Sequence, residues 1–194
     1  MIAGLLLAAG RGRRFGADKL AAKLNGRSVI RWSAEALASE VDALYVVVPL
    51  GSNDAMRSLS RLEVEVCFVE NWARDEGMAS SIRAGVAALP ADVEAVMVAL
   101  ADQPLMSRDV MRALTARWRT GDVSAVAPMY RDGRGHPVLF GRECFASLFA
   151  LRGDVGARSV LDALGSRLAL VAVDANVPVD VDTPADLRML GEMP

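Results

Sequence analysis

Short apolar runs alternate with amphipathic segments along the first 120 residues of the chain. Four of these runs are largely apolar and end in loop or turn residues, and they cover residues 2–8, 43–48, 64–69 and 95–100. Runs of this length and composition are typical of strands that are buried on both faces of a sheet. We therefore predict four buried strands in this part of the chain.

Between these runs, apolar residues recur at helical spacing. The expected helices cover residues 29–37, 53–62 and 78–89, and a fourth begins after Ser107 and extends to about Trp118. Buried strands that alternate with helices form a parallel sheet with helices on both faces. We therefore expect an α/β, three-layer, Rossmann-like fold with a mainly parallel sheet.

The remaining residues are less regular. Strands are expected at residues 123–127, 137–140 and 168–173, and helices near residues 143–151 and 155–164. A last helix begins at Thr183, a good N-cap residue, with Pro184 at its first position and Asp186 at its third. The chain contains no internal repeat, low-complexity segment or linker, so we expect residues 1–194 to form a single domain.

Composition and charge narrow the class of protein. A hydrophobic fraction of 53% and a charged fraction of 24% exclude a disordered chain. The net charge of −2 argues against a nucleic-acid partner that is bound through the overall field of the protein. Two cysteines and one histidine are too few for a disulfide scaffold or a His-rich metal site.

The apolar run at the N-terminus is too short to span a bilayer, and its positive charges follow it, which is the wrong order for a secretory signal. We expect a cytoplasmic protein with reduced thiols and no membrane partner.

A loop rich in glycine and arginine follows the first predicted strand, and residues 8–19 read AAGRGRRFGADK. Small residues at the carboxyl end of a strand let backbone N–H groups approach a ligand, and Arg11, Arg14 and Lys19 add cations that suit a polyphosphate. Phe15 occupies the third glycine position of the dinucleotide fingerprint, and no Gly-Lys-Ser/Thr sequence marks a P-loop. The alternative is a solvated surface turn.

This loop resembles the signature LAAG-x-G-x-R-x-G-x-x-K of the NTP-transferase (MobA-like) nucleotidyltransferase superfamily. Within that superfamily, the chain is most similar to the molybdopterin cytidylyltransferases, which serve molybdenum hydroxylases. The similarity extends to residues 71–85, 100–104, 128–140, 152–158 and 180–187. The resemblance implies a nucleotide-binding part in residues 1–120 and an acceptor-binding part in residues 121–194.

Two acidic residues are candidates for binding a cation. Asp102 follows the fourth predicted strand, at the same edge of the sheet as the glycine loop, where it could cap the next turn or bind Mg²⁺ between nucleotide phosphates. The resemblance implies that Asp102 is a metal ligand and that Asp182 is the second one. Asp180, which we expect on the same strand face as Asp182, is the alternative candidate for the second metal ligand. Plain helix-terminal charge remains the alternative for both.

The resemblance also implies a reaction. An acceptor phosphate oxygen attacks the α-phosphorus of a nucleoside triphosphate, and pyrophosphate leaves. Because this nucleophile is already anionic, no strong general base is needed, and catalysis becomes positioning and charge neutralisation by Mg²⁺, Arg14 and Lys19. Arg14, Lys19 and Asp102 are the expected catalytic residues.

By the same resemblance, residues from three segments of the chain bind the nucleotide. They are Leu7, Ala8, Ala9, Gly10, Arg11, Gly12, Arg14, Lys19, Asn71, Gly77, Ser81 and Asp102. Helix capping is the alternative for the residues around Gly77. The acceptor is assigned to Gly135, His136 and Pro137, a glycine-rich turn in which we expect an exposed histidine ring, with a buried structural histidine as the alternative.

The function implied is transfer of CMP from CTP to molybdenum–molybdopterin, with Mg²⁺ as cofactor and an apo molybdenum hydroxylase as a further candidate partner. Guanylyl transfer is a rival, although guanylyl enzymes typically carry Leu-Ala-Gly-Gly where this chain has Ala9 in the third position. Transfer of another nucleotide, to molybdopterin, a sugar phosphate or phospholactate, is a second rival. A non-catalytic molybdopterin carrier is a third, and Lys19, Asp102 and Asp182 argue against it.

Overall fold

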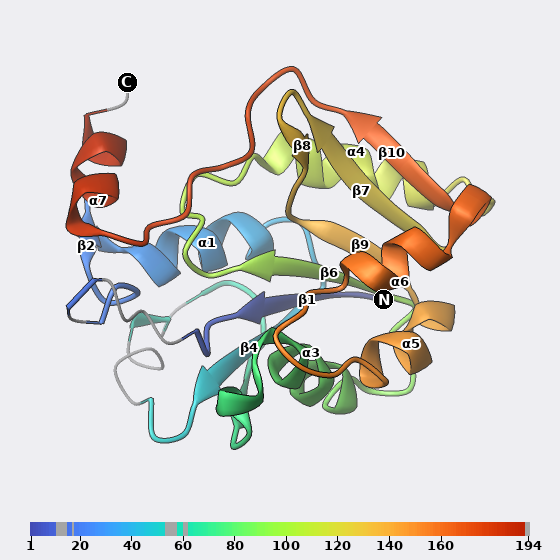
Figure 1. Ribbon diagram of the computed structural model, residues 1–194, viewed down its shortest axis with the longest axis horizontal. Coiled ribbons are helices and arrows are strands. Elements are labelled where there is room, and N and C mark those ends of the chain that lie inside the picture. Colours follow the sequence, from blue (N-terminus) through green and yellow to red (C-terminus); the bar gives the residue numbers. More distant parts are fainter. Residues whose placement is uncertain (11–14, 17, 53–57, 60–61, 193–194) are drawn as a thin grey trace.

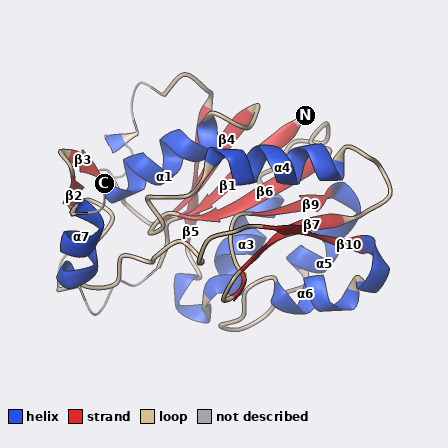
Figure 2. Ribbon diagram, turned by 90° about the horizontal axis from the view of Figure 1, so that it is seen from above, coloured by secondary structure: helices blue, strands red, loops and turns tan. Residues whose placement is uncertain are grey.

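A twisted sheet with helices on both faces forms the centre of the protein in the computed structural model (Figures 1 and 2). The structure describes all residues except 11–14, 17, 53–57, 60–61 and 193–194. In the described part, the strands of this sheet are β1 (Ile2–Leu7), β4 (Ala43–Pro49), β5 (Val66–Asn71), β6 (Ala95–Leu100), β7 (Ala125–Tyr130), β8 (Gly133–Arg134), β9 (Val138–Gly141) and β10 (Leu168–Ala172). A separate small hairpin consists of β2 (Lys23–Leu24) and β3 (Arg27–Ser28).

The strand order is β10-β7-β9-β6-β1-β4-β5, with β8 paired to β7. β1 pairs in parallel with β4 and β6, β4 with β5, and β10 with β7. The exceptions are β9, which is antiparallel to β6 and β7, and β8, which forms a hairpin with β7. A short connection such as the turn of Arg131 and Asp132 between β7 and β8 joins antiparallel strands, because a parallel neighbour requires a crossover. The predicted α/β fold with a mainly parallel sheet is confirmed.

Helices cover the two faces of the sheet, as Figure 2 shows. They are α1 (Val29–Ala38), α3 (Met78–Ala87), α4 (Arg108–Trp118), α5 (Phe145–Phe149) and α6 (Arg158–Ala163). α1 and α4 pack on one face, and α3, α5 and α6 pack on the other. Successive strand residues point to opposite faces, so Leu6 joins the core under α1 and α4, and Leu5 joins the core under α3.

Most predicted elements are present, with shifted ends. β5 begins and ends two residues later than predicted, and the predicted helix over residues 143–151 is a 3-10 turn followed by the short α5. α6 begins at Arg158 and not near residue 155, because the preceding residues form a loop that contacts the start of α3. Most of the helix predicted over residues 53–62 lies outside the described residues, and the β2–β3 hairpin was not predicted.

The last part of the chain returns to the carboxyl edge of the sheet. After β10 the chain runs back along this edge and ends in α7 (Pro184–Gly191), which lies against the β2–β3 hairpin (Figure 1). α7 has the predicted N-terminus: Thr183 and Asp186 form a capping box and Pro184 is in the first turn.

Among the described residues, no helix has the length and apolar content needed to cross a membrane.

Candidate active site

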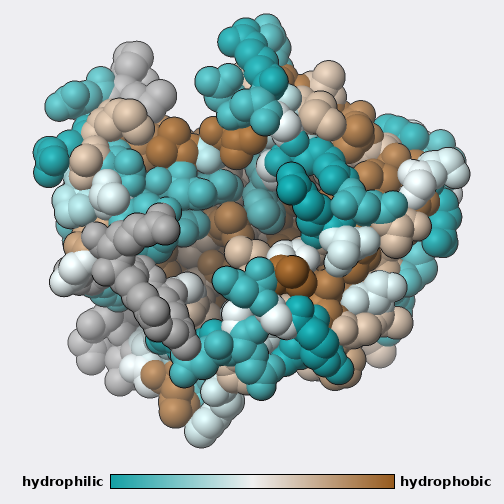
Figure 3. Space-filling model, viewed as in Figure 1, coloured by the Kyte–Doolittle hydropathy of each residue, from teal (hydrophilic) through white to brown (hydrophobic). Residues whose placement is uncertain are grey.

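A pocket of about 640 Å³ opens at the carboxyl ends of β1 and β6. Its lining residues come from the first loop, the start of α3, the end of β6 and the loop before α6: Leu7, Ala8, Ala9, Gly10, Lys19, Leu20, Arg74, Asp75, Glu76, Gly77, Met78, Ser81, Leu100, Asp102 and Asp154. Three small residues after β1 leave room beside the backbone. On the face shown in Figure 3, hydrophilic residues alternate with smaller hydrophobic patches, and the surface is hollowed near its centre.

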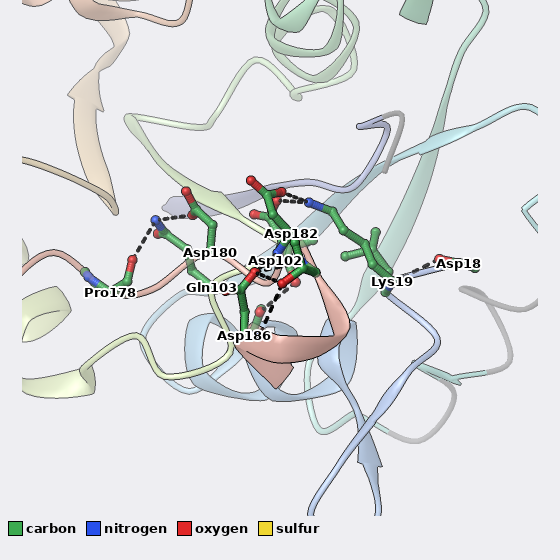
Figure 4. A network of polar contacts seen from close by, with 12 residues as sticks. Asp18, Lys19, Asp102, Gln103, Pro178, Asp180, Asp182 and Asp186 are labelled. Atoms are coloured by element: carbon green, nitrogen blue, oxygen red, sulfur yellow. Dashed lines mark hydrogen bonds and ion pairs between the residues drawn. The ribbon is translucent and has the colours of Figure 1, made fainter. Parts of the chain in front are cut away.

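Lys19 joins two carboxylates at this edge (Figure 4). Its Nζ lies 2.7 Å from Asp102 Oδ2 and 2.9 Å from Asp182 Oδ1. The Lys19 side chain is only 9% exposed. Burial alone would lower the pKa of Lys19, but the hydrogen bonds to the two carboxylates outweigh it, and the pKa lies above its usual value. The ammonium group is therefore held in its charged form between the two residues expected to bind a metal.

The main chain brings Asp182 to Asp102 across 80 residues of sequence. Val181 N–H donates to the backbone oxygen of Asp102, with an N···O distance of 2.9 Å. The N–H groups of Asp182 and Thr183 both donate to Asp186 Oδ2 in the capping box of α7. The start of α7 therefore fixes the backbone of Asp182.

Asp180 has a different partner from Asp182. Gln103 Nε2 donates to Asp180 Oδ1 at 2.8 Å and to the backbone oxygen of Pro178 at 3.3 Å. Gln103 is buried, and burial raises the pKa of Asp180 above its usual value. Asp180 and Asp182 were expected on one strand face, but residues 178–182 form no strand, and the structure brings Asp182, not Asp180, to Lys19.

Asn71, at the end of β5, lies behind the pocket wall. It is buried, and its Nδ2 donates to the hydroxyl groups of Ser80 and Ser81 at 2.8 and 3.0 Å. Ser81 lines the pocket, whereas Asn71 does not. The structure therefore places Asn71 as a support for Ser81.

Gly77 forms the N-cap of α3 at a φ of +92°, a conformation that side chains other than glycine rarely adopt. A Cβ atom there would lie 2.5 Å from Asp154 Cα. Asp154 lines the pocket and accepts a hydrogen bond from Met78 N–H. No role was predicted for Asp154, because nothing in the local sequence indicates that its loop reaches α3. The available signal was its place in residues 152–158, one of the segments that carry the family resemblance.

The turn of Gly135, His136 and Pro137 lies on the other side of Asp102, outside the pocket lining. His136 is half-buried and not exposed as expected, and Pro137 is buried. Tyr130 explains the burial, since its hydroxyl donates to the His136 backbone oxygen at 3.0 Å and its ring packs against Gly135. Burial lowers the pKa of His136, and the negative charge of Asp102 partly opposes this effect.

Three expected nucleotide-binding residues, Arg11, Gly12 and Arg14, lie outside the described residues.

Within the described part of the chain, no group of three or more His, Cys, Asp or Glu side chains is placed to hold a metal by itself. Asp102 and Asp182 nevertheless converge on one point, the Nζ atom of Lys19. Mg²⁺ is commonly held by one or two carboxylates together with substrate phosphates, so this donor set fits it.

Comparison with known sequences connects this geometry with a family. A family model described as the MobA-like NTP transferase domain matches residues 4–168. The chain is 30% identical to the purine catabolism protein PucB of Bacillus subtilis over 96% of this chain and 94% of PucB. It is 33% identical to nicotine blue oxidoreductase of Paenarthrobacter nicotinovorans over 97% of this chain and 96% of that protein. A molybdenum cofactor guanylyltransferase of Cereibacter sphaeroides is 32% identical over 69% of this chain and 65% of that protein.

Two solved structures are similar to this chain over nearly its whole length. Rv0371c of Mycobacterium tuberculosis has a TM-score of 0.83 and 29% identity, over 99% of this chain and 97% of that protein. A structure of Rv0371c in complex with manganese matches with a TM-score of 0.81 and 26% identity, over 100% of this chain and 99% of that one. These likenesses extend over nearly the whole chain, including the residues around the pocket.

Proposed function

The chain belongs to the MobA-like NTP transferase family of nucleotidyltransferases, and on this premise we propose that it transfers CMP from CTP to molybdenum–molybdopterin, with release of pyrophosphate and with Mg²⁺ as cofactor. The observation that carries the proposal is the convergence of Lys19, Asp102 and Asp182 beside a pocket lined by Ala8, Ala9 and Gly10.

The charges of the pocket suggest how the nucleotide lies. Lys19 Nζ lies beside Asp102, after β6, whereas Asp75, Glu76 and Asp154 lie near Gly77 at the start of α3. Lys19 offers a cation to phosphates, whereas Glu76 is already paired with Arg83 at 2.6 Å. The phosphates are therefore expected beside Lys19, and the ribose and base between Ala9 and Gly77, which line the same pocket.

When bound, Mg²⁺ would neutralise phosphate charge and orient the phosphates for attack. Asp102 and Asp182 would hold it, and the structure of Rv0371c in complex with manganese supports a divalent cation as cofactor. Lys19 now occupies the point between these carboxylates, so its ammonium group must leave them and pair with a phosphate. We therefore expect the metal and the nucleotide to bind together.

The acceptor side is the turn of Gly135, His136 and Pro137, which faces Asp102 from the side opposite Lys19. We propose that this turn positions molybdopterin so that its phosphate oxygen reaches the α-phosphorus. We also propose that residues 1–120 bind the nucleotide and residues 121–194 the acceptor, with Asp154 and Asp182 completing the nucleotide site from the second part. An apo molybdenum hydroxylase is the partner that would receive the product.

The choice of CTP rests on Ala9, a buried residue of the pocket lining. Its methyl group replaces the hydrogen of a glycine in the Leu-Ala-Gly-Gly sequence of guanylyl enzymes and leaves less room for a purine. Guanylyl transfer is the second candidate, and the molybdenum cofactor guanylyltransferase relative favours it.

The test is a thermal-shift series with CTP, GTP, ATP and UTP, each with Mg²⁺, followed by measurement of pyrophosphate release in the presence of molybdopterin. A ligand at 100 times its Kd stabilises the folded state by about 2.7 kcal/mol. For a chain of this size that free energy corresponds to a rise in Tm of roughly 5–10 °C. We expect the largest rise and the fastest release with CTP. A larger effect of GTP in both measurements would replace the cytidylyl assignment with the guanylyl one.

A further inference from the structure

We propose that Asp154 determines which base the pocket accepts, by accepting a hydrogen bond from the exocyclic amino group of cytosine and so disfavouring uracil. This inference rests on the proposed function, because it requires a nucleotide in the pocket. Asp154 belongs to the second part of the chain, 76 residues from the helix that it contacts.

The loop before α6 is fixed on the first two turns of α3 by three contacts. Asp154 Oδ1 accepts from Met78 N–H at 3.2 Å, and the Gly153 backbone oxygen accepts from Ala79 N–H at 3.3 Å. On the next turn, Arg83 Nη1 donates to the Leu151 backbone oxygen at 2.9 Å. These contacts place the Asp154 side chain at the wall of the pocket.

Gly77 permits this approach. As the N-cap of α3, it offers no side-chain acceptor for the first N–H groups of the helix, and Asp154 supplies one instead. Any Cβ atom at residue 77 would collide with the Asp154 backbone, at 2.5 Å from Cα and 2.8 Å from N. The glycine therefore lets the loop pack directly against the helix N-terminus.

The chemistry of a carboxylate then sets the preference. An ionised carboxylate has only acceptor sites, about four on its two oxygens, and Met78 N–H uses one of them. Cytosine carries an amino group at the ring position where uracil carries a carbonyl oxygen. An amino group can donate to the remaining acceptor sites, whereas a carbonyl oxygen would be repelled by them. Asp154 at the base end of the pocket therefore favours CTP over UTP.

The experiment compares kcat/KM for CTP and UTP in the wild-type protein, in Asp154→Asn and in the control Asp92→Asn, which removes the same charge from an exposed residue outside the pocket lining. Asparagine keeps one oxygen for Met78 N–H and replaces the other by an NH₂ group that can donate to a carbonyl. We expect Asp154→Asn to lower the CTP:UTP ratio at least about tenfold, the scale of one hydrogen bond to a charged group. We expect Asp92→Asn to leave this ratio unchanged.

Asp154→Glu keeps the acceptor sites and is expected to keep the preference for CTP, and melting curves of all variants check that they fold. If Asp154→Asn slows both nucleotides equally, Asp154 only caps the helix or binds the ribose, and the inference is wrong. An equal change of the ratio in Asp92→Asn would attribute the preference to overall charge and would also overturn the inference. A wild-type protein that releases pyrophosphate from no nucleotide would instead refute the proposed function.

Discussion

The two sides of Asp102 differ in the charge state that they favour. On the pocket side, the pairing of Lys19 with Asp102 and Asp182 raises the pKa of the ammonium group and keeps it charged. On the opposite side, burial raises the pKa of Tyr130 to about 12, raises that of Asp180 and lowers that of His136. All three of these changes favour neutral side chains.

This difference separates two kinds of chemistry along one edge of the sheet. A buried charge costs free energy unless a partner compensates for it, and on the pocket side Lys19 and the two carboxylates compensate one another. Phosphates and a divalent cation are expected there. At the His136 turn, burial favours neutral side chains, and the charged Arg134 beside the turn is paired with Asp162. Substitutions on the two sides should therefore affect nucleotide and acceptor separately.

The largest expected effect is that of Asp102→Asn, because Asp102 lies between the two sides and is a proposed metal ligand. We expect kcat to fall at least about 10³-fold, the upper range for loss of one preorganised charge-stabilising group. Loss of the carboxylate also weakens the ion pair to Lys19, so the free energy of unfolding should fall by about 1–3 kcal/mol. Pyrophosphate release and urea denaturation measure the two effects, and near-normal turnover would contradict the assignment.

Lys19→Met tests whether Lys19 occupies the place of the metal. Without the ammonium group, Asp102 and Asp182 lose the cation that Lys19 supplies, so Mn²⁺ should bind more tightly in the absence of nucleotide than it does to the wild-type protein. Turnover should still fall about 10²-fold, because a cation next to the phosphates is lost. Titration calorimetry with Mn²⁺ alone and pyrophosphate release measure the two effects. Lys23→Met is the matched control, since Lys23 lies in β2 outside the pocket lining; equal results for the two variants would remove the special role of Lys19.

His136→Gln should separate the acceptor side from the nucleotide side. We expect nucleotide affinity to be unchanged and transfer to molybdopterin to fall about tenfold, the scale of one or two hydrogen bonds. Calorimetric titration with CTP and Mg²⁺ and product formation are to be measured on the same variant. Equal losses in both would move the turn into the nucleotide site, and no loss in either would leave His136 a structural residue.

The His136→Gln substitution is also expected to change the pH dependence of the free energy of unfolding. Burial lowers the pKa of His136 in the folded protein below its value of about 6.5 in the unfolded chain. At a pH between these two pKa values, the unfolded chain therefore binds more protons than the folded protein. Wild-type stability should therefore decrease as the pH falls through this window, and His136→Gln should show a smaller decrease. Denaturation midpoints between pH 5 and 8 measure it.

The smallest effect is expected for Asp180→Asn. The asparagine oxygen can still accept from Gln103 Nε2, and the substitution removes a carboxylate whose charge burial disfavours. We expect less than about 1 kcal/mol change in the free energy of unfolding, in the range of substitutions that break no contact. Turnover should stay close to that of the wild-type protein, whereas Asp182→Asn should reduce it strongly. Should Asp180→Asn be the more damaging of the two, Asp180 and not Asp182 serves the metal.

Much of the fold followed from local patterns. The apolar runs predicted β1, β4 and β6 almost to their ends, and the helical spacing predicted α1 and α3, because strand and helix formation depends mainly on neighbouring residues. The strand β9 was predicted to within one residue, but its place between β6 and β7 did not follow, since strand order depends on how the chain pairs across the sheet. The motif of the first loop also sufficed to indicate the family, because its residues are contiguous.

The arrangement of the site was decided by the tertiary structure. Lys19 lies 83 residues from Asp102 and 163 from Asp182, and no local pattern encodes which of two acids, Asp180 or Asp182, meets its Nζ atom. The same holds for Asp154, which reaches the pocket only because the loop before α6 packs on Gly77. Sequence alone thus determined which chemical groups are available at the carboxyl edge of the sheet. Their pairing and charge states depend on distances and burial, which exist only after the chain has folded.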